Sequence, residues 1–387
     1  MKAKVLDIQG KEPCWAIGTV YCELKYKPNI LEEVINDVYR APDLTKSYTD
    51  PEGSDEIMLE DESGRVLLVG ENIRATPFIT GAVIGVLGME ADAGTFQVLD
   101  ICYPIPIPQK PLSLSPGRSA VAGNKKIAVV SGLNISTTSP RRLLKLQLLQ
   151  EYLTGNLCSP ELISNIGKLL VCGDSLSFKF DTSSSGELVN CLSTLGNFLS
   201  NVTQSIPVAL MPGAKDPSNR SLPQKPLHKA LFSQTLGAHL EEVNRDVLKL
   251  VTNPYYFHIE GLEILATAGQ SINDICKYLI PNQGSSQEED TIEHRLDLME
   301  CTMKWQNIAP TVPDTLWAYP FPSSDPFLLD EWPHVYIVGN QPGYGFRDLD
   351  VHGRKIKLIS IPVFSSTGDV VLLDLTTLET EVINIGA

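Results

Sequence analysis

The sequence predicts two domains of different fold class: a small all-β barrel, followed by an α/β domain in which helices cover a β-sheet. Three observations lead to this prediction. Strand-like runs separated by turn residues fill the N-terminal quarter, a proline-rich stretch follows at 104–124, and apolar strands then alternate with amphipathic helices. We therefore place the boundary in the proline-rich stretch and expect a barrel domain over residues 1–112 and an α/β domain over residues 113–387.

Five runs make up the predicted barrel. They lie at residues 14–24, 56–60, 65–69, 82–88 and 95–103. Turn residues join the second run to the third and the fourth to the fifth, as in β-hairpins, and a helical insert at 30–39 supplies one long connection. Five strands with one long connection are typical of the OB-fold, although another small β-barrel or sheet fits the same pattern.

The α/β domain is predicted from apolar strands that alternate with helices. The first helix, at 141–153, follows Ser139 and Pro140, a capping residue and a proline suited to the first helical position. A second amphipathic helix is expected at 186–202. Strands are expected at 127–130, 169–172, 206–210, 262–266, 335–338, 357–360 and 370–375.

Composition excludes several classes of function. The formal net charge of −15 disfavours binding to phosphate backbones, so we expect little direct nucleic-acid binding. No apolar run approaches the ~20 residues of a membrane-spanning helix, so no membrane segment is expected. The eight cysteines form no Cys-x-x-Cys pair, and most sit among apolar residues, which indicates buried thiols in a reducing compartment.

Glycine-containing turns follow four of the predicted strands, at 131–133, 173–177, 213–216 and 339–342. Their order resembles the pattern of calcineurin-like phosphoesterases, which place Asp-x-His, Gly-Asp-x-x-Asp, Gly-Asn-His-Asp/Glu and Gly-His-x-His at successive strand ends. That resemblance implies an α/β sandwich. In an active member the ligands would hold two metal ions ~3.5–4 Å apart and activate a bridging water.

Most of those ligands are replaced in this chain. At the second turn Asp174 survives but Ser177 replaces the closing Asp, the charge of Lys215 repels a metal ion, and the Asn340 amide is a weak ligand compared with imidazole. We therefore predict an inactivated phosphoesterase domain without catalytic residues, metal or cofactor, in which the glycines serve the turns and Asp174 is a turn or capping residue. The degenerate positions are Ser131, Leu133, Asp174, Ser177, Ala214, Lys215, Asn340 and Pro342.

A barrel followed by a degenerate phosphoesterase resembles the B-type small subunits of replicative DNA polymerases. Long strings at 293–321 (EHRLDLMECTMKWQNIAPTVPDTLWAYPF) and 335–342 (VYIVGNQP) are specific within that group. On these strings the chain is identified as a member of the small-subunit family of DNA polymerase delta, of a fungal type. The resemblance covers essentially the whole chain. Because such relatives usually carry additional N-terminal sequence, we expect the barrel domain to be N-terminally incomplete.

The resemblance also implies a function. Members of this family are non-catalytic scaffold subunits in the nucleus that support DNA replication and repair synthesis. They bind the cysteine-rich, metal-binding C-terminal module of the catalytic subunit and a third subunit that reaches the sliding clamp. From the residues alone, two rival functions stay open: a metal-dependent phosphoesterase with a rearranged site, and an OB protein that binds single strands through basic and aromatic residues.

An amphipathic helix at 293–305 and the proline- and aromatic-rich segment 310–322 are candidates for contacts with partner subunits. Trp, Tyr and Met are enriched at the centre of protein interfaces. The alternative is that these side chains cover one face of the sheet within the chain. The candidate contact residues are Leu298, Met303, Trp305, Trp317 and Tyr319.

Overall fold

The structure, a computed structural model, describes residues 4–8, 10, 12–30, 45–50, 52–91, 94–112, 126–177, 185–236, 247–278 and 290–386. The helical insert predicted at 30–39 lies outside the described residues, except for its first residue, as does the second part of the predicted connector. The chain forms two compact units, each made of two stretches: unit 1 is Met1–Pro108 with Ser271–Trp332, and unit 2 is Gln109–Gln270 with Pro333–Ala387.

This division differs from the predicted one mainly because residues 271–332 belong with the barrel rather than with the α/β domain, and the first boundary lies at 108/109 instead of 112/113. Contacts within unit 1 explain the difference. The Tyr48 hydroxyl donates a hydrogen bond to Asp274 across 2.7 Å, and Lys27 pairs with Asp314 at 3.0 Å. Gly81 lies so close to the second stretch that a Cβ on it would come within 1.8 Å of the Pro310 carbonyl oxygen.

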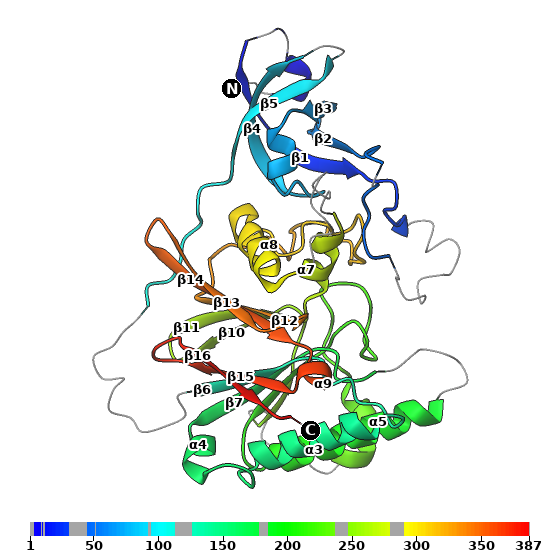
Figure 1. Cartoon of the computed structure of the whole chain (residues 1–387), viewed down its shortest axis with the longest axis vertical. Coiled ribbons are helices and arrows are strands. Elements are labelled where there is room, and N and C mark those ends of the chain that lie inside the picture. Colours follow the sequence, from blue (N-terminus) through cyan, green and yellow to red (C-terminus); the bar gives the residue numbers. More distant parts are fainter. Residues whose placement is uncertain are drawn as a thin grey trace. The chain divides into compact units, whose positions relative to one another are not determined.

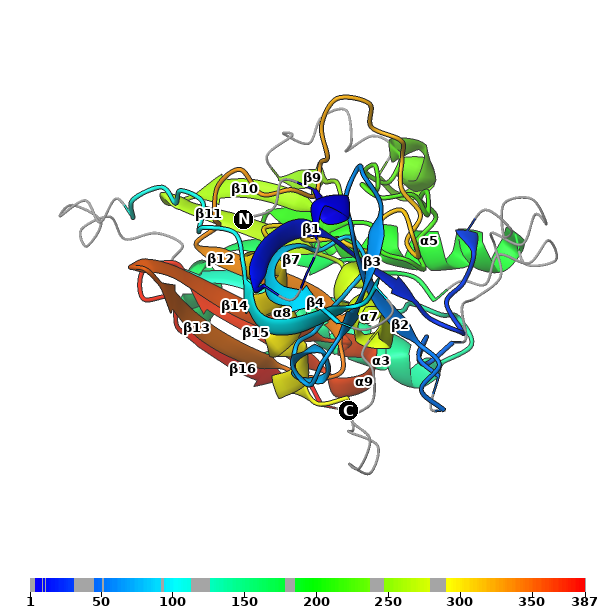
Figure 2. The ribbon, with the colours of Figure 1, turned by 90° about the horizontal axis from the view of Figure 1, so that it is seen from above.

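The predicted five-stranded barrel is confirmed. Its strands close in the order β1-β2-β3-β5-β4, and Figures 1 and 2 show them curving around a common centre. Alternate side chains point inward, as a closed barrel requires. The strands are β1 (Cys14–Glu23), β2 (Glu56–Glu60), β3 (Arg65–Val69), β4 (Val83–Glu90) and β5 (Phe96–Cys102), with short helices η1 (Val5–Asp7) and α2 (Asn72–Ala75) beside them.

The second stretch of unit 1 is mainly helical. It contains α7 (Gln270–Ile275), η5 (Cys276–Tyr278) and α8 (Ile292–Trp305). Thr291 caps α8, since its side chain accepts a hydrogen bond from the His294 backbone N–H. Helix α8 buries residues around most of its circumference, so it is a core helix of the fold.

Unit 2 is an α/β sandwich of two mixed sheets, as predicted. One sheet has the order β10-β11-β12-β14-β13 and the other β16-β15-β6-β7-β8-β9. The strands are β6 (Lys126–Val130), β7 (Ile166–Cys172), β8 (Val208–Met211), β9 (Leu248–Leu250), β10 (Tyr255–Ile259), β11 (Leu262–Thr267), β12 (Val335–Gln341), β13 (Gly345–Val351), β14 (Arg354–Pro362), β15 (Asp369–Asp374) and β16 (Thr380–Asn384).

Two apolar cores hold unit 2 together. The first lies between the sheets, where Leu170 and Met211 meet Ile264 and Ile337. The second lies on the other face of the six-stranded sheet, which α3 (Pro140–Leu153) and α5 (Ser185–Val202) cover (Figure 1). Shorter helices complete the unit: α4 (Pro160–Ser164), η4 (Lys229–Phe232) and α9 (Phe364–Thr367). No helix among the described residues is long and apolar enough to span a membrane.

Candidate functional site

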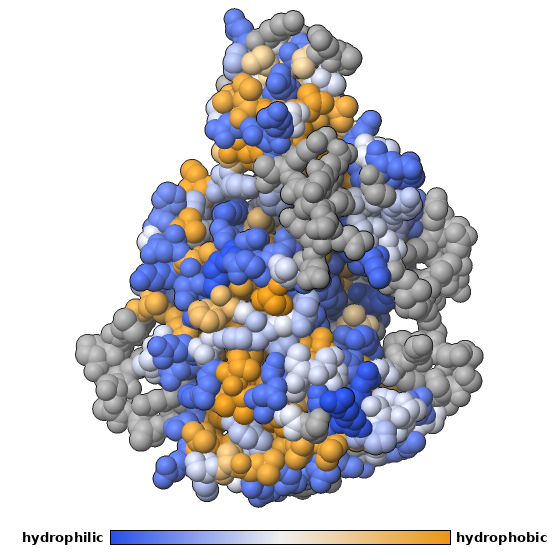
Figure 3. Space-filling view, viewed as in Figure 1, coloured by the Kyte–Doolittle hydropathy of each residue, from blue (hydrophilic) through white to orange (hydrophobic). Residues whose placement is uncertain are grey.

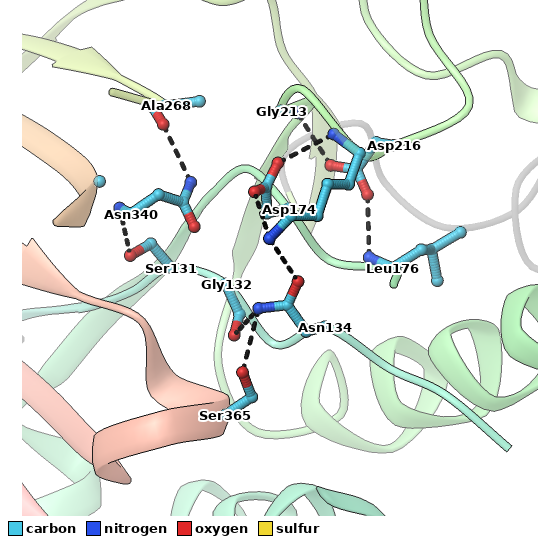
Figure 4. Close-up of polar contacts among 12 residues, drawn as sticks. Ser131, Gly132, Asn134, Asp174, Leu176, Gly213, Asp216, Ala268, Asn340 and Ser365 are labelled. Atoms are coloured by element: carbon cyan, nitrogen blue, oxygen red, sulfur yellow. Dashed lines mark hydrogen bonds and ion pairs between the residues drawn. The ribbon is translucent and has the colours of Figure 1, made fainter. Parts of the chain in front are cut away.

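The ends of β6, β7 and β12 meet inside unit 2, where the degenerate phosphoesterase positions were predicted. The Gly132 backbone N–H donates to the Gly173 carbonyl oxygen across 3.0 Å. The Asn340 backbone N–H donates to Ser131 Oγ across 2.8 Å, and its Nδ2 donates to the Ala268 carbonyl oxygen at 2.9 Å (Figure 4). The same Nδ2 also donates to the Cys172 carbonyl oxygen at 3.1 Å. Side chains from both sheets therefore surround one small polar site.

Backbone geometry explains why glycine persists here. Gly173 has a φ of +76°, and a Cβ on Gly213 would lie 2.3 Å from the Asp174 backbone nitrogen. Asp174 itself has a φ of +53° and Asn340 one of +56°, conformations that Asp and Asn tolerate better than other side chains do. The turns thus keep their shape without any metal ligand.

Lys215 supplies a positive charge to this site. Its Nζ lies 3.2 Å from Asp174 Oδ2 and donates to Asn134 Oδ1 across 3.1 Å. Its backbone N–H donates to the other Asp174 oxygen across 3.0 Å. The Lys215 side chain is half-exposed, whereas that of Asp174 is 8% exposed. One lysine therefore contacts both oxygens of the buried carboxylate.

Asp216 is a second carboxylate at the site, and the sequence pattern assigned it no role. Its Oδ2 accepts hydrogen bonds from the backbone N–H groups of Gly213 and Ser175, and its Oδ1 accepts one from Leu176. Burial raises the pKa of Asp216 to about 7, and the charge of Asp174 adds to the rise, while the three N–H donors oppose it. Its place three residues after a strand-end glycine was the signal available in the sequence.

The remaining predicted positions are either packed within the fold or exposed without a ligand-type side chain. Ser131 is fully buried and donates to the Pro362 carbonyl oxygen across 3.0 Å, and Leu133 lies in the helix-covered core. Ser177 is half-buried, with its backbone N–H on the Ile135 carbonyl oxygen. Ala214 and Pro342 are exposed. None of these five side chains is an imidazole or carboxylate that could replace a missing ligand.

This donor set does not fit a dinuclear metal centre. The described residues contain no group of three or more His, Cys, Asp and Glu side chains that could hold a metal ion. Both Asp216 oxygens already accept backbone hydrogen bonds, and the Lys215 ammonium lies against Asp174. Two metal ions need several anionic or imidazole ligands at once, whereas this site has two carboxylates, Asp174 and Asp216, and both already have partners within the chain.

The structure corrects part of the predicted set of partner contacts. Leu298, Met303 and Trp305 are buried, with 1–3% of each residue exposed, so they are core residues of the chain and not surface contacts. The cause lies in the sequence pattern of α8. Its apolar residues gave the pattern of an amphipathic helix with one exposed face, whereas the helix is buried on several faces. Trp317 and Tyr319 are half-buried, and Tyr319 lies edge-on to Phe321 with their ring centroids 6.5 Å apart.

Aromatic and basic side chains of the barrel that could bind a single strand already contact other side chains of the chain. The Tyr21 ring already has Lys27 Nζ 4.4 Å and Arg65 Cζ 4.1 Å from its centroid. Lys27 is paired with Asp314 and Arg65 with Glu60. Unit 1 carries 12 Lys and Arg against 29 Asp and Glu, a formal net charge of −17, whereas unit 2 carries 19 against 17, a net charge of +2. A strongly acidic barrel unit repels a nucleic-acid backbone.

Comparisons with known proteins agree on one group. The family of B-type subunits of "DNA polymerase alpha/epsilon" matches residues 127–345, and the "DNA polymerase delta subunit OB-fold domain" matches residues 2–101. The "DNA polymerase delta small subunit" of Saccharomyces cerevisiae is 58% identical over 99% of this chain and 81% of that protein. Its namesake from Oryza sativa subsp. japonica is 35% identical over 97% of this chain and 84% of that protein.

Among solved structures, an archaeal phosphodiesterase covers 67% of this chain and 98% of its own, at 13% sequence identity and a TM-score of 0.33. That similarity is too weak to assign a fold. The assignment of unit 2 as an α/β sandwich comes from its two sheets, and that of the barrel as an OB-fold comes from its closed strand order together with the family match over residues 2–101.

Proposed function

We infer that this chain, which belongs to the DNA polymerase delta small-subunit family, serves the polymerase in replication and repair synthesis as a non-catalytic scaffold. The observation that carries the non-catalytic part is the Lys215 ammonium on Asp174, at the point where a phosphoesterase needs a metal ion. In this proposal the chain keeps the strand-end turns of that site and has an ion pair in place of the metal ligands.

The scaffold role requires partners. We propose that the chain binds the metal-binding C-terminal module of the catalytic subunit and the third, clamp-binding subunit, and that it works in the nucleus with little direct contact to DNA. The acidic unit 1 supports this proposal, because a net charge of −17 attracts a basic polypeptide and speeds its association. Apolar side chains are exposed on the outer face of the barrel, and Figure 3 shows apolar surface over the barrel. They include Ile17, Val83 and Leu99.

Co-expression of the full chain with a tagged catalytic subunit tests the scaffold proposal. The two half-buried aromatic candidates are the sharpest probes, so Trp317→Ala and Tyr319→Ala are combined in one variant. Tyr256→Ala is the matched control, since Tyr256 is an exposed aromatic residue of unit 2. If these residues anchor a partner, affinity falls by about 10-fold to 100-fold in the double variant and stays unchanged in the control.

Failure of the wild-type chain to co-purify with either the catalytic or the third subunit would overturn the scaffold proposal itself. Wild-type binding that the double variant retains would instead place the contact away from Trp317 and Tyr319.

The rival phosphoesterase function is tested on the purified full chain. We expect no metal-dependent hydrolysis of a simple phosphodiester such as bis(4-nitrophenyl) phosphate in the presence of Mn²⁺ or Zn²⁺. The single changes Ser131→Asp and Asn340→His should leave the chain equally inactive, because each adds only one ligand. Turnover by the wild type, or near-stoichiometric metal in the purified protein, contradicts the non-catalytic proposal.

A further inference from the structure

We propose that Lys215 is the built-in cation of the strand-end site: its ammonium does for the turns after β6, β7 and β8 what a metal ion does in an active phosphoesterase. In this proposal the Lys215 ammonium takes the position that a metal ion would have in an active phosphoesterase. This inference concerns the internal construction of unit 2 and stands independently of the scaffold role.

The ammonium has a prepared receptor. Asn134 Nδ2 donates to the Gly132 carbonyl oxygen at 3.1 Å and to Ser365 Oγ at 3.0 Å. Those two donations fix which end of the amide faces the lysine, so Oδ1 is presented to Nζ at 3.1 Å. The Asn134 backbone N–H also donates to the Asp174 carbonyl oxygen, which fastens the two acceptors of the ammonium to one another.

The charges of the site require a cation there. Asp174 is 8% exposed, and the buried Asp216 carboxylate accepts the backbone N–H groups of the next two residues, Ser175 and Leu176, so two carboxylates lie at the same turn. A buried carboxylate without a partner is costly, whereas a hydrogen-bonded ion pair offsets part of its desolvation. Lys215 reaches Asp174 from the turn after β8 with both its ammonium and its backbone N–H, so it links that turn to the turn after β7.

The receptor atoms are oxygens, which hard divalent cations also prefer. Removal of the ammonium leaves Asp174 Oδ2 and Asn134 Oδ1 without the cation that they share. Asn340 Oδ1, near the end of β12, is a further oxygen of the site: it is buried without a hydrogen-bond partner, 2.8 Å from where a Cβ on Gly132 would lie. The proposal therefore predicts that the lysine and a divalent cation exclude one another.

Thermal unfolding of the full chain tests the ion pair. Lys215→Met keeps the aliphatic stem and removes the charge, and we expect the Tm to fall by about 2–4 °C. Adding Asp174→Asn to that variant should recover most of the loss, because no unpaired carboxylate is left. The control is Lys229→Met, a change to an exposed lysine of η4, which should not shift the Tm. A loss no larger than the control's, or one that Asp174→Asn leaves in place, overturns the proposal.

Metal titration tests the exclusion. Millimolar Mn²⁺ should leave the Tm of the wild type unchanged and raise that of Lys215→Ala, and the rise should vanish in the Lys215→Ala/Asp174→Asn double variant. Equal stabilisation of the wild type and Lys215→Ala overturns the proposal, because the ammonium would then not occupy the cation position. Absence of any stabilisation in Lys215→Ala overturns it as well, because the oxygens would then not form a cation site.

Discussion

Asp216 in unit 2 and Asp274 in unit 1 are both almost fully buried, yet their charges are satisfied in opposite ways. Asp216 accepts three backbone N–H groups from the neighbouring turns. Asp274 accepts three hydroxyl groups, one from Tyr48 at 2.7 Å and two at 2.6 Å from Thr311 and Thr315. Backbone donors are present whatever side chain occupies their position, whereas hydroxyl donors are specific residues.

The difference bears on how each unit tolerates substitution. Turns held by backbone groups and glycines keep their geometry when neighbouring side chains are exchanged. Unit 1 has no such freedom, because its buried carboxylate depends on three particular side chains, and one of them, Tyr48, links the first stretch of the unit to residues 271–332. Substitutions at both carboxylates and at their donors probe this contrast, beginning with the largest expected effect.

Asp274→Ala should destabilise unit 1 by about 3–5 kcal/mol, since it leaves three buried hydroxyl groups without their acceptor. Urea denaturation followed by tryptophan fluorescence measures the loss. Asp330→Ala, a change to an exposed carboxylate of the same unit, serves as the control and should be neutral. A loss below about 1 kcal/mol would show that Asp274 does not hold the two stretches together.

Asp216 should make stability depend on pH. Its pKa is raised from 3.8 to about 7 in the folded chain, so the folded state binds more protons than the unfolded state between these values. The stabilisation is fully present below about pH 4 and is lost as the pH rises through about 7. Relative to Asp216→Asn, the wild type should lose up to about 1.4 kcal/mol per pH unit between pH 5 and 7.

Denaturant unfolding of both proteins at pH 5, 6, 7 and 8 gives the comparison. Asp174, the charged group that acts on Asp216, and its ion-pair partner Lys215 are present in both proteins, so the comparison isolates Asp216. Parallel pH profiles for the wild type and Asp216→Asn would show that Asp216 titrates normally.

Tyr48→Phe removes one of the three hydroxyl donors of Asp274 and should cost about 1–2 kcal/mol. The ring remains to pack edge-on against Tyr278, so the change reports the hydrogen bond alone. Equilibrium unfolding compared with the exposed-site control Tyr256→Phe measures it. If both variants unfold like the wild type, the hydroxyl contributes nothing to the junction.

Ser175→Ala should have the smallest effect, within about 0.5 kcal/mol of the wild type. The Ser175 backbone N–H donates to Asp216, and alanine keeps that donor. Its Oγ is buried without a hydrogen-bond partner, so its removal leaves nothing unsatisfied. A loss as large as that of Tyr48→Phe would contradict the view that this site is held by its backbone.

Local sequence patterns predicted much of the fold. The barrel strands, helices α3 and α5 of unit 2 and the strands that end at the degenerate site follow periodicities of a few residues, and glycines and prolines mark their ends. The resemblance to phosphoesterases also grouped Ser131, Asp174, Lys215 and Asn340, which the structure brings together. Strands β9, β10, β13 and β16 were missed because edge strands alternate polar and apolar residues in short, weak patterns.

What depends on long-range contact could not be predicted. Nothing near Tyr48 or Asp274 in the sequence indicates that they meet, so residues 271–332 were assigned to the wrong unit. The charge of Lys215 was interpreted as an obstacle to metal, but its pairing with Asp174 and Asn134 needs three turns in their folded positions. The burial of Trp305 likewise depends on elements distant in sequence.

The two-stretch construction of unit 1 bears on how the chain is made. Tyr48 precedes Asp274 by 226 residues. At the ~5–20 residues per second of protein synthesis, the barrel leaves the ribosome on the order of tens of seconds before the stretch that completes its unit. During that interval the Tyr48 hydroxyl lacks its acceptor Asp274. A nascent-chain binding factor has its longest opportunity there, and a pause in translation before residue 271 would prolong it.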